Sequence, residues 1–579
     1  MRPILFLLQR SLYNSATMRL LRQSLLDTDL VHLRAIAEFW EIQLTTSRQR
    51  DVALELSQAI TDSAAVERAF SRLPEDQEAA LSELLAAGGE MPQRVFTREW
   101  GDIRAMGPGR MARDQPWQDP VSPAEALWYR GFLFKSFEEG PDGAYEAVSI
   151  PLELKDHLPQ PEPVQPSITL EPVTPPSAIF AQADLLLDDA CTLLAYVHNE
   201  HPRLGPNRRW REQHIERLSS RLHSRNMARF RFLVHVASRA GWFVQKETGR
   251  LSLDADAVTA WFQRSPFDQR CTLTDAWRHD PTWNDLFHIP TLHPEDTGAW
   301  RNDPVLARQT ILRHLRACTP ASWYALERFV AAAKDIDPDF QRPDGDYDSW
   351  YIRDEETGAY LSGFESWDAV EGRLIRYVLT KPMAWLGLVD VGATDNGQSD
   401  TVFRLNQDGA AVLGLAGTPS STPLPAARLQ SGFRVSVPAA RRYERFQLAR
   451  VADWHRTGDR FLYRLTPSSL ERARKESISI ERVLEFLQEI TEAPIPSQIE
   501  RALKRWNSRG TEAVLESAVL LRLSEPELME KVTASPRLAR LIEDRIGPAA
   551  AVVRRQDWPR IVTELEKMGL LPAVRDLPD

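Results

Sequence analysis

The sequence predicts a mainly α-helical α+β fold with small β-hairpins, built from tandem winged-helix-like domains. Three observations predict it. Apolar residues recur at helical spacing over most of the chain, and three such helical stretches are each followed by two short apolar runs around a turn. A proline-rich segment separates the first stretch from the rest. Since 579 residues exceed the size of one core, we expect about three to five domains.

The first domain, helical and winged-helix-like, is predicted over residues 18–158, after a start at 1–17 that we expect to be disordered or wrongly assigned. Ser122, followed by Pro123 and Glu125, marks a helix start, because the hydroxyl can accept from a free amide and proline suits the first helical position. Two apolar runs then flank Gly-Pro-Asp-Gly, which predicts the hairpin of a winged helix.

The segment 159–179 is predicted to be a linker. Seven prolines lie between residues 159 and 176 and no helical period crosses them, so a semi-rigid, polyproline-like conformation is expected. A second winged-helix-like, Arg-rich domain is predicted over 180–295, and a third winged-helix-like domain over 296–415. Each combines helical periodicity with a later pair of short apolar runs.

Charge is distributed unevenly along the chain. The net charge of −10 argues against a surface that coats nucleic acid non-specifically. Residues 1–158 hold 17 basic and 24 acidic side chains, whereas residues 201–239 hold ten Arg and two Glu. Residues 428–475 hold twelve basic and four acidic side chains. The positive charge is therefore concentrated in two segments.

Cysteine use and hydropathy indicate the compartment. Cys191, Cys271 and Cys318 lie far apart and form no Cys-x-x-Cys pair, so neither a disulfide framework nor a zinc ribbon is predicted. No apolar run approaches the roughly 20 residues of a membrane helix. We expect a reducing, bacterial-type cytoplasm, with association to the nucleoid, and no membrane partner.

One distinctive stretch runs from Tyr463 to Trp506. Thr466 precedes Pro467 at a predicted helix start, and Ser479 precedes a second amphipathic helix. A Pro-Ile-Pro break then separates the second helix from a third. The third helix is expected to open with a capping box and to place apolar side chains on one face. The capping box would use Ser497 and Glu500.

In the order of its pieces, this stretch resembles the N-terminal accessory domain of XPB-type DNA helicases. The pieces are a strand, the Thr-Pro-Ser-Ser-Leu cap and the Pro-x-Pro break before a helix that closes on Trp506. Periodicity alone also fits an ordinary three-helix unit. The resemblance covers about Leu424 to Val532 and implies that residues 424–579 form an XPB N-terminal-like α/β domain, as in bacterial helicase-associated proteins. It carries no catalytic residue over to this sequence.

The phosphate-binding loop of a helicase motor is missing from the sequence. Such a loop ends in Gly-Lys-Ser/Thr, because backbone amides cradle the phosphates while Lys neutralises them and the hydroxyl holds Mg²⁺. No Gly-Lys pair occurs in the chain. We therefore expect no ATPase motor, no cofactor and no enzyme activity of the chain's own.

Two further sets of residues match parts of metal sites. His198 and His201 lie three positions apart, but no third ligand follows at a suitable spacing. Ser349 occupies the glycine position of a calcium loop, so an acidic surface loop is the preferred interpretation there. We predict no metal site. Four acidic residues occupy the ligand positions of that loop: Asp344, Asp346, Asp348 and Glu355.

The strongest functional candidates are basic. Arginines spaced about four apart can line one side of a helix and suit phosphates, and a neighbouring indole can stack on a base. A solvated helix face that pairs with acidic neighbours is the alternative interpretation. The candidate nucleic-acid-binding residues are Arg208, Arg209, Trp210, Arg211, Arg217, Arg221, Arg225, Arg229, Arg231, Arg441, Arg442 and Arg445.

Together these features predict a non-catalytic DNA-binding or helicase-associated accessory protein, acting in DNA repair, transcription or another DNA transaction. DNA is the expected partner, and a separate helicase or ATPase subunit is a second one. The alternative is a protein–protein scaffold that recruits such a motor without touching DNA.

Overall fold

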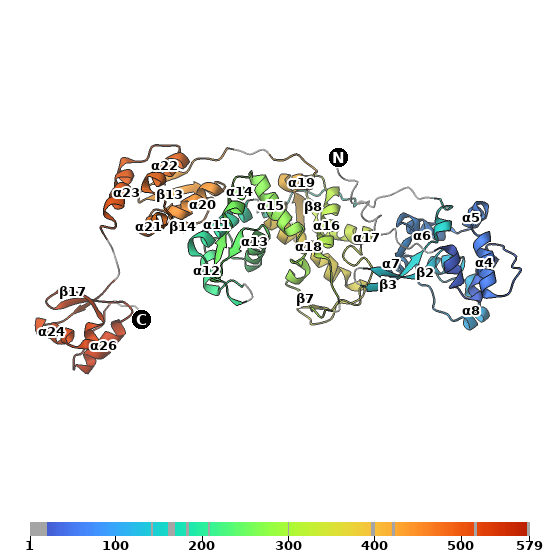
Figure 1. Ribbon diagram of the computed structural model, residues 1–579, viewed down its shortest axis with the longest axis horizontal. Helices are drawn as coiled ribbons and strands as arrows, with labels where there is room; N and C mark the ends of the chain where they lie inside the picture. Colours follow the sequence, from blue (N-terminus) through green and yellow to red (C-terminus); the bar gives the residue numbers. More distant parts are fainter. Residues whose placement is uncertain are drawn as a thin grey trace. The chain divides into compact units, whose positions relative to one another are not determined.

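The protein has a mixed α+β fold, as predicted, with helices beside small antiparallel sheets (Figure 1). None of the helices described below is both long and apolar enough to cross a membrane. The chain divides into two compact units, Met1–Gln430 with Arg434–Arg464, and Ser431–Phe433 with Leu465–Asp579. The computed structural model describes residues 20–140, 143–159, 168–180, 184–206, 209–298, 300–394, 400–419, 423–513 and 518–575.

The first block of the larger unit has a core of its own, and the predicted start at 1–17 lies outside the described residues. Ser122 caps α9 as predicted, because its hydroxyl accepts from the Glu125 amide at 3.0 Å. The sheet order is β1-β3-β2. The elements are α2 (Leu21–Leu26), α3 (Leu30–Phe39), α4 (Gln49–Ala59), α5 (Ser63–Phe70), α6 (Glu75–Ala86), β1 (Glu90–Pro92), α7 (Gln93–Trp100), α8 (Pro108–Asp114), η1 (Pro116–Gln118), α9 (Pro123–Tyr129), β2 (Phe134–Gly140), β3 (Gly143–Ser149) and α10 (Leu152–Lys155).

The second block follows the segment predicted as a linker, part of which lies outside the described residues. In the described part, Ile168 is buried in the main core and Val173 bridges to Trp323. The elements that follow are β4 (Ala178–Phe180), α11 (Leu185–Glu200), α12 (Glu212–Ser219), α13 (Met227–Arg239), β5 (Phe243–Gln245), β6 (Leu251–Leu253), α14 (Ala255–Phe262), α15 (Pro266–Arg278), η3 (Asp285–His288) and β7 (Leu292–Pro294).

The third block shares its core with the second. Its sheet has the order β4-β10-β11-β8, so β4 reaches it from the second block. The elements are α16 (Pro304–His314), η4 (Leu315–Ala317), β8 (Tyr324–Ala325), α17 (Leu326–Ile336), β9 (Ile352–Asp354), η5 (Phe364–Ser366), η6 (Asp368–Gly372), α18 (Arg373–Val378), η7 (Leu379–Met383), β10 (Val389–Ala393), β11 (Thr401–Leu405) and α19 (Gln407–Val412).

A four-stranded sheet with one helix completes the larger unit. The sheet order is β12-β13-β15-β14, and Phe446 of its helix lies in the shared core. Helix α20 packs against α11 of the second block (Figure 1). Helix α20 connects β13 to β14 along the chain. The elements are β12 (Arg428–Gln430), β13 (Arg434–Pro438), α20 (Arg442–Val451), β14 (Asp453–Arg456) and β15 (Arg460–Arg464).

The smaller unit begins with the three predicted helices. Thr466 and Ser469 form a capping box on α21, and Ser479 caps α22. The capping box expected at Ser497 is wrong, because Pro496 takes the N-cap position and Ser497 is already helical. A sheet of order β16-β18-β17 follows. The elements are α21 (Pro467–Lys475), α22 (Ile480–Thr491), α23 (Ser497–Arg509), β16 (Val519–Arg522), α24 (Pro526–Ala534), α25 (Pro536–Ala539), β17 (Ile542–Gly547), β18 (Ala550–Val553) and α26 (Trp558–Lys567).

Candidate nucleic-acid interface

The first Arg-rich segment forms α12, α13 and the turns before them. Asn226 caps α13, since its side chain accepts from the Arg229 amide at 3.0 Å. Arg221 is half-buried, and Arg208 lies outside the described residues. The predicted arginines that the structure places on the surface are Arg209, Arg211, Arg217, Arg225 and Arg231.

Of the residues of this segment that were predicted to contact nucleic acid, Arg229 is buried and Trp210 is half-buried. Arg229 is only 4% exposed and forms an ion pair with Asp189, which is fully buried. A guanidinium closed off in this way cannot reach a phosphate, so Arg229 anchors α13 to α11. Trp210 is half-buried and packs against the rings of Tyr196 and Phe230, with centroids 6.4 and 6.0 Å away.

The centre of the second basic segment is also structural. Arg442 and Arg445 on α20 are 2% and 0% exposed. Nε of Arg442 donates to the Asp188 carboxylate at 2.8 Å, and Arg445 lies over the ring of Phe461 and donates to Thr192. The prediction that these two arginines contact nucleic acid is wrong, because α20 turns them towards α11.

Arg441, at the start of α20, is partly buried. Its Nε donates to the Pro425 carbonyl at 2.9 Å and its Nη1 to Glu444 at 3.2 Å. These bonds hold the chain that leads into the sheet. They leave Arg441 a weaker candidate than the exposed arginines of the second block.

The structure brings the two basic segments together at a place that the sequence did not indicate. The turn after β14 meets the end of α12, where the Thr457 hydroxyl donates to the Arg221 carbonyl at 2.5 Å. The Arg221 guanidinium lies over the rings of Tyr196 and Trp454, 5.2 and 5.6 Å from their centroids. The run Trp454-His455-Arg456, an aromatic beside two basic residues, is the signal that could have found this junction.

The outer face of α13 carries Arg231, His235 and Arg239 at four-residue spacing, so all three lie on one side of the helix. The Asp280 carboxylate accepts from His235 and pairs with Arg239 at 3.3 Å. Burial acts to raise the pKa of Asp280, but hydrogen bonds from His235 and Thr282 outweigh it and hold the pKa below its ordinary value. Asp280 therefore stays ionised and fixes this face of α13.

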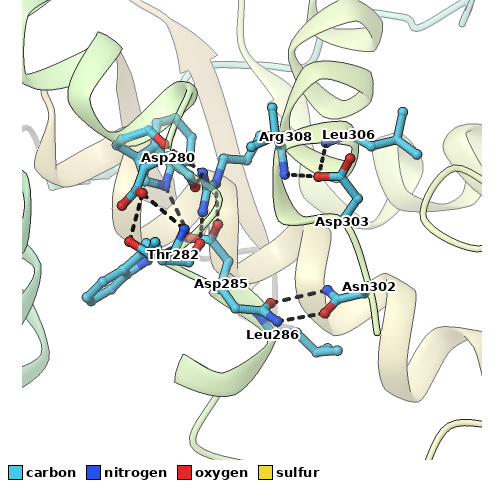
Figure 2. Close-up of polar contacts among 12 residues, drawn as sticks. Asp280, Thr282, Asp285, Leu286, Asn302, Asp303, Leu306 and Arg308 are labelled. Atoms are coloured by element: carbon cyan, nitrogen blue, oxygen red, sulfur yellow. Dashed lines mark hydrogen bonds and ion pairs between the residues drawn. The ribbon is translucent and has the colours of Figure 1, made fainter. Parts of the chain in front are cut away.

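A buried network supports the loop that carries Asp280 (Figure 2). Arg308 donates to the Asp285 carboxylate at 2.6 Å and to the carbonyls of Trp277 and Asp280 at 2.6 and 2.7 Å. The indole of Trp283 also donates to Asp285, at 3.1 Å. Because both Arg308 and Asp285 are enclosed and paired, the loop presents Asp280 to α13 in one position.

The hairpin after α13 adds further positive charge. β5 and β6 are joined by a tight turn in which the Lys246 amide donates to the Arg250 carbonyl at 3.0 Å and Gly249 takes a φ of +73°. Lys246, Glu247 and Arg250 are exposed. The turn therefore projects two cations and one carboxylate beside α13.

The two motifs that match parts of metal sites make contacts with residues close in sequence. Oδ1 of Asp346 accepts from the amides of Asp348 and Ser349 at 2.9 and 3.2 Å. His201 ends α11 in the left-handed conformation, with its ring centroid 6.5 Å from that of His198. Within the described ranges, no group of three or more His, Cys, Asp or Glu residues is arranged to hold a metal ion.

Comparison with protein families identifies one region. A family model described as "Helicase conserved C-terminal domain" matches residues 429–547, which run from β12 to β17. No curated protein matches the chain.

This match corrects the prediction that the chain is not an enzyme. That prediction depended on the absence of a phosphate-binding loop and of other catalytic motifs, whereas the match to a helicase C-terminal domain points towards enzymatic function. The absence of a Gly-Lys pair remains a property of the sequence, but it does not decide the question. The matched region indicates that this chain is a helicase-related protein.

Proposed function

We propose that this helicase-related protein binds duplex DNA through the second block, in a DNA transaction such as repair or transcription. The exposed arginines of α12, α13 and the β5–β6 turn carry the proposal, because they lie in one folded block beside the helicase-matched region. Arginine contacts to phosphates supply affinity without regard to sequence.

The topology of three blocks supports tandem winged helices. In the first and third blocks, a short strand after a helix pairs with the second strand of the later hairpin, giving the orders β1-β3-β2 and β8-β11-β10. In the second block the same place is taken by residues 202–204, where Arg203 bridges to Arg250 and the Leu251 amide donates to the Pro202 carbonyl. In a winged helix, α13 would be the recognition helix and residues 246–250 the wing.

The finer assignment of residues 424–579 as an XPB N-terminal-like domain is also part of this proposal. The capped helices α21 and α22 and the Pro-Ile-Pro break before α23 support it. The helicase-matched region overlaps this stretch and extends to β17. A domain of this kind would place the DNA-binding block beside helicase machinery.

Charge reversal at the proposed recognition helix and wing tests the assignment. Arg231→Glu with Arg250→Glu should weaken binding of a short duplex by about tenfold or more, because two attractive phosphate contacts become repulsive. Fluorescence anisotropy with the full chain measures the effect.

Arg34→Glu with Arg50→Glu is the matched control, since both arginines are exposed on the acidic first block. Equal losses in the two double variants would contradict the proposed surface. No binding by the unaltered chain at about 50 mM salt would contradict DNA binding and favour a protein scaffold that recruits a separate motor.

A further inference from the structure

A shallow, open pocket of about 470 Å³ lies where the end of α12 meets the β14–β15 turn. Ser220 and His223 line it from the second block, and Trp454, His455 and Arg456 line it from the sheet. The pocket thus joins the proposed DNA-binding block to the helicase-matched region. Its volume lies within the range of small-ligand sites, about 300–1,000 Å³.

The lining combines an indole with positive charge. Trp454 offers a ring, while Arg456 and His455 are exposed at its side. None of the described residues that line the pocket carries a carboxylate, although a carboxylate oxygen of Asp188 lies 3.8 Å from Nε2 of His223. An aromatic ring beside an arginine cation suits a ligand that has both a flat base and a phosphate.

The indole is held in a fixed orientation. Its Nε1 donates to the Thr457 hydroxyl at 3.1 Å, and that hydroxyl donates in turn to the Arg221 carbonyl. Arg221 lies over the Trp454 ring, so the ring is supported by a cation while it lines the pocket. A ring that is already ordered loses little entropy when a base stacks on it.

We propose that this pocket binds one unpaired nucleotide of DNA, with the base on Trp454 and the phosphate on Arg456. The inference rests on the proposed DNA binding and deepens it. A base inside a duplex is stacked on both faces and presents only its edges, whereas an unpaired nucleotide can turn a face towards the indole. The protein therefore prefers a duplex that ends in a single strand.

Binding of three labelled DNA hairpins to the full chain tests the pocket. One hairpin is blunt, one carries a short thymidine tail, and one carries a tail of abasic sugar-phosphate units. We expect the thymidine tail to tighten binding about tenfold over the blunt hairpin, because a stacked base contributes substantially. The abasic tail keeps the phosphates and should give only a small part of that gain.

Substitutions then test whether the preference for the tailed hairpin comes from this pocket. Trp454→Leu and, separately, Arg456→Ala should remove most of the preference for the tail and leave blunt binding nearly unchanged. Trp117→Leu is the matched control, because Trp117 is also half-buried with its Nε1 bonded to a side chain, Glu38, in the first block. Arg456 is exposed, so its variant keeps the test valid even if Trp454→Leu misfolds.

Distinct outcomes separate the two proposals. Equal binding of the blunt and thymidine-tailed hairpins overturns the pocket while DNA binding stands. A tail preference that survives both substitutions, or an abasic tail as effective as thymidine, also overturns it. Failure of all three hairpins to bind contradicts the proposed DNA binding and the pocket with it.

Discussion

Buried arginines connect loops and helices in the interior of this protein. Arg308 is 1% exposed and bonds to the Asp285 carboxylate and to three backbone carbonyls, while Arg342 is 2% exposed and pairs with Glu371. A guanidinium has five donors, so one side chain can satisfy several acceptors of a loop that has no regular structure. Each such arginine is costly to bury and is therefore paired.

One buried histidine makes the first block sensitive to acid. His32 is enclosed in α3 and its Nε2 donates to the Trp128 carbonyl at 2.9 Å. Burial lowers the pKa of His32 to about 4. Because an unfolded histidine titrates near pH 6.5, the unfolded chain binds more protons between these values, and stability falls as the pH falls from about 6.5 to 4.

We expect the first block to lose about 2 kcal/mol of unfolding free energy between pH 7 and pH 5 from this group. Urea unfolding at the two pH values measures the loss. His32→Gln should reduce the difference, whereas His157→Gln, at an exposed position of the same block, should not. The same pH dependence in His32→Gln and the unaltered chain would show that His32 is not responsible.

The sequence showed which segments are rich in arginine but not which of those arginines are exposed. Arg217 on α12 and Arg229 on α13 belong to one basic segment, yet Arg217 is on the surface and Arg229 is closed off with Asp189. The difference comes from α11, whose carboxylates Asp188 and Asp189 are distant in sequence from their partners. A pattern confined to one helix cannot show such a partner.

At the scale of elements, the contact of α11 with α20 joins the helicase-matched region to the second block. Besides the Arg442 ion pair, the Cys191 thiol donates to the Arg442 carbonyl at 3.2 Å and Asn199 donates to the Ala449 carbonyl at 2.8 Å. Burial raises the pKa of Cys191 to about 11, so the thiol stays protonated at neutral pH and able to donate.

Removal of the ion pair between Arg442 and Asp188 should weaken the contact between α11 and α20. Arg442→Ala leaves the Asp188 carboxylate buried with a weaker partner, Arg445 at 3.5 Å, and we expect a loss of about 3 kcal/mol. Thermal or urea unfolding of the full chain measures it. Arg313→Ala removes an exposed pair with Asp337 and should cost less than about 1 kcal/mol. Similar losses of unfolding free energy in both variants would show that the buried pair does not stabilise the contact between α11 and α20.

Helices and hairpins were predictable where the signal is local. The caps at Ser122 and Thr466 lie where expected, because a capping hydroxyl needs only residues three positions ahead. Strands β1 and β8 were not predicted. Each has two or three residues and pairs with a strand more than fifty positions later, so these strands form through tertiary contacts.

At the scale of the whole molecule, an acidic protein carries a localised basic surface. The net charge is −10, yet α12, α13 and the hairpin after them expose arginines beside the helicase-matched region. If the protein binds DNA as proposed, repulsion elsewhere on the surface would limit indiscriminate binding, while the basic surface would supply phosphate contacts. Its location was predicted from charge counts, but the pocket beside Trp454 required the fold.

The salt dependence of DNA affinity tests the central claim most directly. If the basic surface contacts phosphates, the logarithm of the binding constant should fall linearly with the logarithm of salt concentration. Replacing three surface arginines should make that slope shallower by about 2.7, or about 0.9 for each lost contact. The variant is Arg209→Ala, Arg211→Ala and Arg217→Ala.

The same measurement on a variant of the acidic block, with Arg22, Arg34 and Arg50 changed to Ala, should give the slope of the unaltered chain, since these exposed arginines lie outside the basic surface. We predict a shallower slope only in the first variant. Identical slopes in all three proteins would contradict DNA binding through the second block.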